Sequence, residues 1–151
     1  MVLVDRVIEQ WLNAGVELRP GAPCDAIRAV ERLLGAALPD DARAFYEKAN
    51  GMRDFAYDRW FVSIWSCERL ISEHEVQRGS DARGAYMDVS FADVMISSWY
   101  FWFRVREDGS VSVFVESIAQ ELATFSFFLS RYLEDPESVG LCEVGQTLSS
   151  I

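Results

Sequence analysis

The side chains best suited to chemistry are few in this chain of 151 residues, and they lie far apart in the sequence. The only histidine, His74, stands between Glu73 and Glu75, which is typical of a surface residue on a charged helix rather than of a catalytic base. A zinc site would need several His, Cys or carboxylate ligands close together, and the sequence shows no such cluster. Three cysteines form no C-x-x-C pair and indicate reduced thiols in a reducing compartment: Cys24, Cys67 and Cys142.

Motifs for nucleotide binding and for nucleophilic catalysis are missing as well. The sequence has no Gly-rich phosphate loop, whether G-x-x-x-x-G-K or G-x-G-x-x-G, and no G-x-S-x-G elbow. Carboxylates are plentiful, so hydrolysis by a carboxylate pair stays open as an alternative, although most of them lie beside an arginine or at an expected helix end. We therefore expect a protein that is not an enzyme and that holds no cofactor and no metal.

The charge balance favours a protein as the partner. The formal net charge is −10, from 24 acidic and 14 basic side chains. Nucleic acids are bound by clusters of Lys and Arg that contact phosphates, so we expect no nucleic-acid ligand. A negative field would attract a basic partner and speed its encounter, although the same acidity could serve solubility alone.

The sequence also bears on location. A membrane span would need about 18 or more uncharged apolar residues in a row, and no such run is present. In the N-terminal run MVLVDRVIEQWLNAG, charged residues stand where a signal peptide would be apolar: Asp5, Arg6 and Glu9. We expect a cytoplasmic protein that does not contact membranes.

Apolar residues at helical spacing predict three helices in the first third of the chain. A stripe over residues 3–12 marks the first, and a loop rich in Gly and Pro follows it. The second begins near Asp25, read as its N-cap, and closes at Gly35 in a left-handed conformation. The third begins around Pro39 and is expected to end in a cap at Asn50-Gly51.

Alternating apolar residues over 91–116 predict the β half of the fold. A three-residue turn, Glu107-Asp108-Gly109, keeps one face of the hairpin uniformly apolar, whereas a two-residue turn, Asp108-Gly109, does not. The three-residue turn requires a positive φ at Gly109. The resulting register pairs Val105 with Val111, Phe103 with Val113 and Phe101 with Val115.

Three further elements complete the expected chain. Residues 60–65 predict a short strand, and Ser66 is expected to cap a helix that runs to about Gln77. A last helix is expected to begin near Ser117, which has capping-box spacing to Gln120, and to end at 134–136. In the tail over 137–151, four apolar residues hint at a packed strand or short helix: Leu141, Val144, Leu148 and Ile151.

Large aromatic side chains with arginine mark a candidate interface. The face of the sheet opposite Phe101 and Phe103 is expected to carry them, and protein interfaces favour this combination. The alternative is that a helix covers this face and makes a second small core. The residues expected on the face are Tyr100, Trp102, Arg104, Arg106, Ser112, Phe114 and Glu116.

The order of the helical motifs resembles a known family. A helix ends at a Leu-Gly pair, a Leu-Pro follows, and a second helix closes on Asn-Gly, which resembles the start of the SUKH superfamily, the Smi/Knr-type domain. The matching residues are Glu31, Leu34, Gly35, Leu38, Pro39, Asn50 and Gly51. A closing helix of the pattern s-F-x-x-F-L-x-x-Y-L, over 124–133, also resembles the family, so that the resemblance covers about residues 20–135. It departs at 89–93, where many members have a Gly/Asp-rich stretch.

The resemblance implies an α+β fold in which helices pack against an antiparallel or mixed sheet, and no catalytic centre; we expect a single domain over residues 1–151. Many bacterial members are immunity proteins that bind and neutralise a toxin, and others are regulatory or scaffold proteins. We expect this chain to occlude a cognate toxin that is basic, with a protein-interaction module as the alternative. The motif residues look structural, so the expected contacts come from our own reading: Asp54, Tyr57, Asp58 and Trp60 in the loop after the third helix, and Asp93, Tyr100, Trp102, Arg104 and Glu116 on the sheet.

Overall fold

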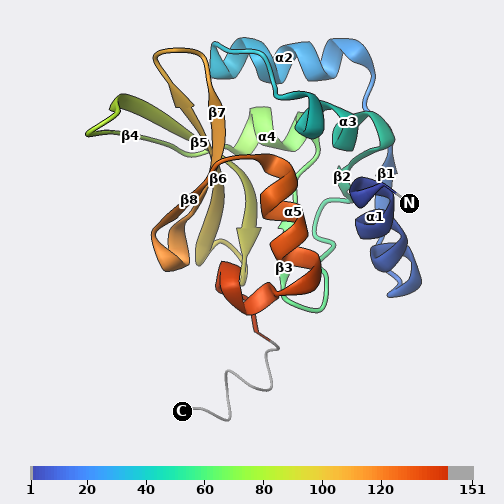
Figure 1. Cartoon of the computed structure of the whole chain (residues 1–151). Helices are drawn as coiled ribbons and strands as arrows, with labels where there is room; N and C mark the ends of the chain where they lie inside the picture. The colour runs from blue at the N-terminus through green and yellow to red at the C-terminus, as the bar shows by residue number, and fades with distance from the viewer. Residues whose placement is uncertain (1, 143–151) are drawn as a thin grey trace.

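The computed structural model describes residues 2–142, which form an α+β fold (Figure 1). A six-stranded antiparallel sheet has the order β3-β5-β6-β7-β8, with β4 paired to another part of the long strand β5. A separate two-stranded ribbon, β1-β2, lies near the N-terminal helix α1 (Figure 1). None of the helices within residues 2–142 has the length and apolarity that crossing a bilayer requires.

The three expected N-terminal helices are present. They are α1 (Leu3–Asn13), α2 (Cys24–Leu34) and α3 (Asp40–Lys48). Gly35 ends α2 with a φ of 71°, which confirms the predicted left-handed cap. The N-cap of α2 was wrong, because Pro23 occupies that position and Asp25 lies inside the first turn, where acidic side chains favour the positive helix end.

The predicted helix cap at Asn50-Gly51 was also wrong. These residues belong to β2 (Ala49–Met52), which pairs with β1 (Leu18–Pro20). Gly51 has a φ of 68°, and a Cβ there would lie 2.5 Å from the backbone carbonyl of Trp65. Asn50 accepts a hydrogen bond from the backbone N–H of Cys67 at 2.8 Å. The pair therefore holds the start of another helix, α4, against the ribbon.

The central hairpin has the predicted register. Strands β6 (Trp99–Arg106) and β7 (Val111–Val115) pair so that Val105, Phe103 and Phe101 face Val111, Val113 and Val115. The φ of Gly109 is 84°, as the three-residue turn requires. A uniformly apolar face therefore sufficed to fix this register.

The strands on either side were predicted less well. The strand expected at 60–65 is shorter, β3 (Val62–Ile64), and the helix after Ser66 stops early, as α4 (Cys67–Glu73). Instead of continuing that helix, β4 (Val76–Asp81) forms a hairpin with β5 (Gly84–Val94). Most of β4 is exposed on both faces, so it carries no alternation of apolar and polar residues that would reveal a strand.

The last helix begins later than predicted. Ser117 lies in a 3-10 turn over Glu116–Ile118, and β8 (Gln120–Leu122) follows and pairs with β7. Thr124 caps α5 (Phe125–Glu134), accepting a hydrogen bond from the backbone N–H of Phe127. A second 3-10 turn, Pro136–Val139, follows α5, so its predicted end is confirmed. Leu141 is buried, whereas Val144, Leu148 and Ile151 lie outside the described residues.

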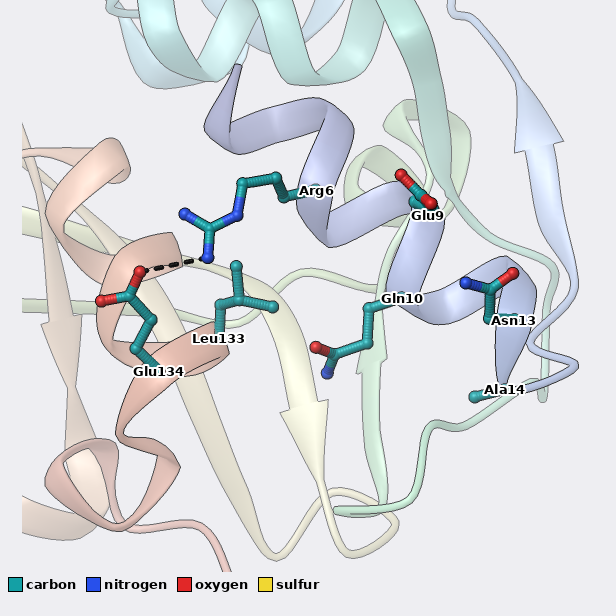
Figure 2. A pocket seen from close by; sticks show the side chains of 7 residues that line it. All are labelled: Arg6, Glu9, Gln10, Asn13, Ala14, Leu133 and Glu134. Carbon is teal, nitrogen blue, oxygen red and sulfur yellow. Dashed lines mark ion pairs between the residues drawn. The ribbon is translucent and has the colours of Figure 1, made fainter. Parts of the chain in front are cut away.

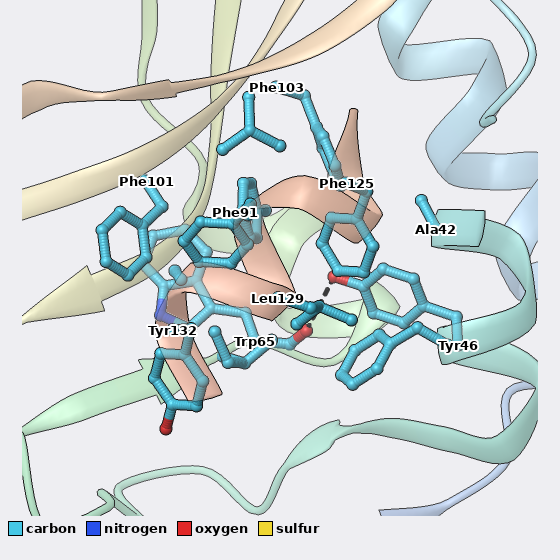
Figure 3. Packing of buried hydrophobic residues seen from close by; sticks show 14 of the residues in the cluster. Ala42, Tyr46, Trp65, Phe91, Phe101, Phe103, Phe125, Leu129 and Tyr132 are labelled. Carbon is cyan, nitrogen blue, oxygen red and sulfur yellow. Dashed lines mark hydrogen bonds between the residues drawn. The ribbon is translucent and has the colours of Figure 1, made fainter. Parts of the chain in front are cut away.

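The core lies between α5 and the inner face of the sheet (Figure 3). Phe91 stacks on Phe103 with ring centroids 4.2 Å apart, and Phe128 meets the edge of Phe101 at 4.8 Å. Burial of each such ring stabilises the fold by roughly 1.5–3 kcal/mol. On the other side of α5, the indole N–H of Trp11 donates to the hydroxyl of Tyr132 at 2.7 Å, which ties α1 to α5.

Candidate partner-binding surface

The outer face of the sheet gathers the five predicted sheet residues. Asp93 on β5 pairs with Tyr100 on β6, and the Tyr100 ring meets the edge of Trp102 at 5.4 Å. The Glu116 carboxylate accepts a hydrogen bond from the backbone N–H of Tyr100 at 2.8 Å. Arg104 lies further along β6. Tyr100, Trp102 and Arg104 alternate along β6 with the inward-facing Phe101 and Phe103, as the sequence predicted.

Arg104 is nevertheless held inside this face. Its guanidinium donates to both carboxylate oxygens of Asp88, at 2.8 and 2.9 Å, and Asp88 is fully buried. The rings of Tyr86 and Phe114 lie 3.7 and 4.0 Å from the guanidinium carbon. Burial alone would lower the pKa of Arg104, but the Asp88 carboxylate outweighs it and raises the pKa. The charge is thus neutralised within the molecule.

Arg106 closes a second ionic cluster next to the first. It donates to Asp81 at the end of β4, at 2.8 and 2.9 Å, and to Glu121 of β8 at 2.6 Å. Glu121 also accepts from the Ser112 hydroxyl. The Arg106 hydrogen bonds hold the pKa of Asp81 at about 2. With Ser112 of β7, the cluster joins four strands across the outer face. The sequence did not reveal this cluster because its acids lie far from Arg106 in the chain.

Different elements cover different parts of this outer face. The arginines are covered by side chains of β4, β5, β7 and β8. Trp102 is only 3% exposed, and its indole N–H has no hydrogen-bond partner among the described residues. At the β3 end of the face a helix does lie over it, because Arg69 of α4 donates to the hydroxyl of Ser63 and lies over the ring of Trp65. The Trp65 indole in turn donates to Asp93 and contacts the Tyr100 ring. Around the arginines most polar groups are paired within the molecule, and the half-exposed residues of the face are Tyr86, Tyr100, Phe114, Glu116 and Glu121.

The loop over residues 53–61 carries the other four predicted residues, of which two are at least half-exposed and two are buried. Asp54 is exposed and Tyr57 is half-exposed, stacked on Phe61 with centroids 6.0 Å apart. Asp58 and Trp60 are buried. One carboxylate oxygen of Asp58 accepts the backbone N–H groups of Trp60 and Val62, at 2.8 and 2.9 Å, and so sets the shape of the loop.

A second turn lies directly against this loop. The backbone N–H of Met95 donates to the carbonyl of Phe61 at 2.9 Å. Asp93 organises the turn, since its carboxylate accepts from the backbone N–H and the hydroxyl of Ser97. Met95, Ile96 and Ser97 all have left-handed backbones, with φ between 53 and 63°. Such a conformation costs about 1–2 kcal/mol per non-glycine residue and is uncommon for β-branched Ile96.

The loop and the turn together expose a group of large apolar side chains, which we call the apolar end. Left-handed non-glycine residues concentrate in the same place, since Phe55 and Phe61 also have φ values of 67 and 60°. Arg69 of α4 lies over the Phe55 ring and joins it to Trp65. The members of the apolar end, with their exposed fractions, are Phe55 (79%), Phe61 (38%), Met95 (39%), Ile96 (68%) and Trp99 (45%).

Sequence reasoning missed this group as a binding surface. Met95 and Ile96 looked like the start of a strand, because nothing in VMISSW announces a turn. A turn of left-handed residues normally carries Gly, Asn or Asp. The weak signal was a run of apolar residues on both faces just before the polar pair Ser97-Ser98.

A shallow depression lies elsewhere, between α1 and α5 (Figure 2). Arg6 of α1 pairs with Glu134 of α5 at 3.2 Å across it, and Leu133 lies between the helices. Within residues 2–142, no three His, Cys, Asp or Glu side chains come together as a metal site would require.

The family comparison agrees with this geometry. A model of the SMI1/KNR4 family (SUKH-1) matches residues 21–131, from the loop before α2 to the last turns of α5. The chain belongs to the SMI1/KNR4 family. The resemblance predicted from the sequence is thereby confirmed, while α1 lies outside the range that the SMI1/KNR4 model matches. No curated protein matches the chain significantly in sequence.

Proposed function

We propose that this protein binds a cognate toxin in the cytoplasm and neutralises it by covering the toxin's active region, without catalysing a reaction. Its place in the SMI1/KNR4 family supports a binding role. The net charge of −10 favours a basic partner, whose encounter it would accelerate. The observation that carries the proposal is the apolar end, where five large apolar side chains are exposed and four of them, all but Trp99, have a left-handed backbone.

Two physical arguments support the apolar end as the contact. Exposed apolar patches on soluble proteins commonly mark interaction sites, and aromatic anchors supply most of the binding energy at interfaces. Backbone strain persists only where the surrounding structure over-determines it, and it gathers at functional sites. Exposure and backbone strain coincide at Ile96. Gly or Asn at this position would avoid the strain, yet the residue is apolar and 68% exposed.

The nine predicted contact residues fall into two roles in this proposal. Asp54 and Tyr57 would touch the partner beside the apolar end, and the half-exposed Tyr100 and Glu116 would extend the contact along the sheet. The buried residues would hold that surface in shape: Asp58, Trp60, Asp93, Trp102 and Arg104. Truncating a buried tryptophan would therefore test the fold more than the contact.

The test uses exposed residues and a matched control. The protein is co-purified with the product of the neighbouring gene, and the Kd is then measured for Phe55→Ala and Trp99→Ala. Each should weaken binding about 30-fold or more, as a hot-spot residue worth about 2 kcal/mol would. The control is Phe127→Ala, because Phe127 is 44% exposed on α5 and outside the apolar end.

Two outcomes would count against the proposal. Unchanged affinity in both apolar-end variants would remove the apolar end from the interface. Capture of a regulatory protein of the host cell, with no toxin encoded nearby, would favour the other expected role, a protein-interaction module.

A further inference from the structure

A small cavity lies where α1, the loop 53–61 and α5 meet, away from the apolar end. It has a volume of about 50 Å³, room for a few water molecules or one small polar group. Two of its lining residues, Gln10 and Ala14, also line the depression between α1 and α5 in Figure 2. The remaining lining residues are Trp11, Asp58, Arg59, Trp60 and Tyr132.

Asp58 has more hydrogen-bonding capacity here than the fold uses. Its Oδ1 accepts two backbone N–H groups, but its Oδ2 is buried and has no hydrogen-bond partner among the described residues. The indole N–H of Trp11 is close enough to lower the pKa of Asp58, but its direct hydrogen bond goes to the Tyr132 hydroxyl at 2.7 Å. The whole residue is only 7% exposed, so a buried carboxylate oxygen is left unpaired.

An unpaired buried acceptor costs about 1–3 kcal/mol and calls for an explanation. Shaping the loop does not supply one, because the Oδ1 atom of an asparagine could accept the same two N–H groups without burying a charge. The second oxygen is therefore surplus to the fold, and Asp58 lines a cavity that shares Gln10 and Ala14 with a surface depression.

The walls of the cavity suit a compact cation. The indoles of Trp11 and Trp60 and the phenol ring of Tyr132 surround the carboxylate. Aromatic faces attract ammonium groups, and the Trp60 ring already holds the Arg59 guanidinium at 4.2 Å. One free oxygen accepts a single donor, which fits the point charge of an ammonium better than the two-pronged guanidinium. The depression outside carries Glu9, together with Glu134, which is paired with Arg6.

We infer that this cavity is a binding site for a primary ammonium group, supplied by a lysine side chain of the bound partner that enters between α1 and α5. The inference rests on the proposed function for the identity of the partner and adds a second, polar contact to it. Arg59 is exposed, and the contacts described hold it by its position over Trp60 and by the attraction of its charge to Asp58, so its side chain can swing aside to admit the lysine. The lysine would replace Arg59 as the cation over Trp60.

The first experiment needs no partner. Methylammonium chloride is titrated into the protein up to about 100 mM, a range suited to the millimolar affinity of a single contact. The indole N–H signals of Trp11 and Trp60 are followed by NMR, with sodium chloride at equal ionic strength as the reference. Saturable shifts are expected in the wild type and in Asp54→Asn, an exposed carboxylate of the same loop, and their loss in Asp58→Asn.

Acidity provides a second readout of the same contact. Burial raises the pKa of Asp58 to about 6, so the carboxylate that holds the ammonium is lost as the pH falls below that value. The affinity for methylammonium should drop about tenfold between about pH 7 and about pH 5. The other charged groups near the cavity and depression are Arg6, Glu9, Arg59, Tyr132 and Glu134.

The ammonium site and its assignment to a lysine of the partner are tested by separate results. Absence of saturable shifts in the wild type, or equal shifts in Asp58→Asn, would overturn the cavity as an ammonium site while leaving partner binding at the apolar end untouched. With a toxin in hand, Asp58→Asn should weaken its affinity about tenfold, with Asp25→Asn, an exposed carboxylate on α2 outside the proposed contact, as the control. An unchanged toxin affinity alongside methylammonium binding would overturn the assignment to the partner's lysine.

Discussion

The outer face of the sheet and the apolar end use similar residues in opposite ways: the outer face encloses its large and charged side chains, and the apolar end exposes its large side chains. On the outer face, Arg104 and Arg106 are each enclosed by carboxylates and rings, and almost no charge is left for a partner. At the apolar end, Phe55 and Ile96 stay 79% and 68% exposed. Both regions combine large side chains with polar neighbours, so composition alone does not separate a region that is complete from one that awaits a partner.

The comparison also separates two uses of a buried acid. Both carboxylate oxygens of Asp88 accept hydrogen bonds from Arg104. One oxygen of Asp58 accepts two backbone N–H groups of the loop, and the other has no hydrogen-bond partner among the described residues. An acid that is fully satisfied stabilises the structure it sits in, whereas an acid that is half satisfied has capacity for something that the fold does not supply.

The largest effect should come from breaking the completed region. Arg104→Ala leaves the fully buried Asp88 without its cation, and removing one partner of a buried ion pair costs about 3–5 kcal/mol of unfolding free energy. Urea unfolding measures the loss. The double variant Arg104→Met with Asp88→Leu is the control and should recover most of it. A loss below about 1 kcal/mol for Arg104→Ala would mean that the pair is better hydrated than its geometry indicates.

An intermediate effect is expected from acidity at Asp58. Its folded pKa of about 6 lies above the unfolded value of 3.8, so the folded state binds the proton more tightly. Stability should therefore rise as the pH falls from about 7 to about 5, by about 1 kcal/mol from this group. Asp58→Asn should lose this contribution, which is read from urea midpoints of the two proteins at both pH values. The same pH response in both proteins would contradict it.

The smallest effect should come from relieving strain at the apolar end. Ile96→Gly removes the steric penalty of a left-handed β-branched residue and should raise the unfolding free energy by about 0.5–1 kcal/mol, while weakening partner binding. Val76→Gly is the matched control, at an exposed strand residue outside the left-handed positions, and should destabilise the fold. If Ile96→Gly destabilises the protein as much as Val76→Gly, the strain argument fails.

Much of the fold was predictable because a simple period encodes it. The register of β6 and β7 followed from one apolar face, and the three N-terminal helices followed from their stripes. The errors came where a distant contact overrides a local signal. Asn50-Gly51 reads as a cap, but Trp65 and Cys67 recruit it into a strand.

The candidate surface was only partly predictable, for a related reason. The register places Trp102 and Arg104 on the outer face, but it does not tell that Asp88 and Tyr86 enclose Arg104, since those residues come from a strand that was expected to begin later. Nor does a sequence reveal left-handed backbone at Met95 and Ile96 when no glycine marks it. Exposure at the apolar end depends on that backbone.

The central claim is that the apolar end, and not the enclosed outer face, meets the partner. Hydrogen–deuterium exchange of the free protein and of its complex with the co-purified toxin tests this most directly. We predict strong new protection in residues 53–61 and 95–99, with little change in the part of β6 that carries Arg104 and Arg106. Protection confined to the outer face, with 95–99 exchanging as in the free protein, would contradict the account.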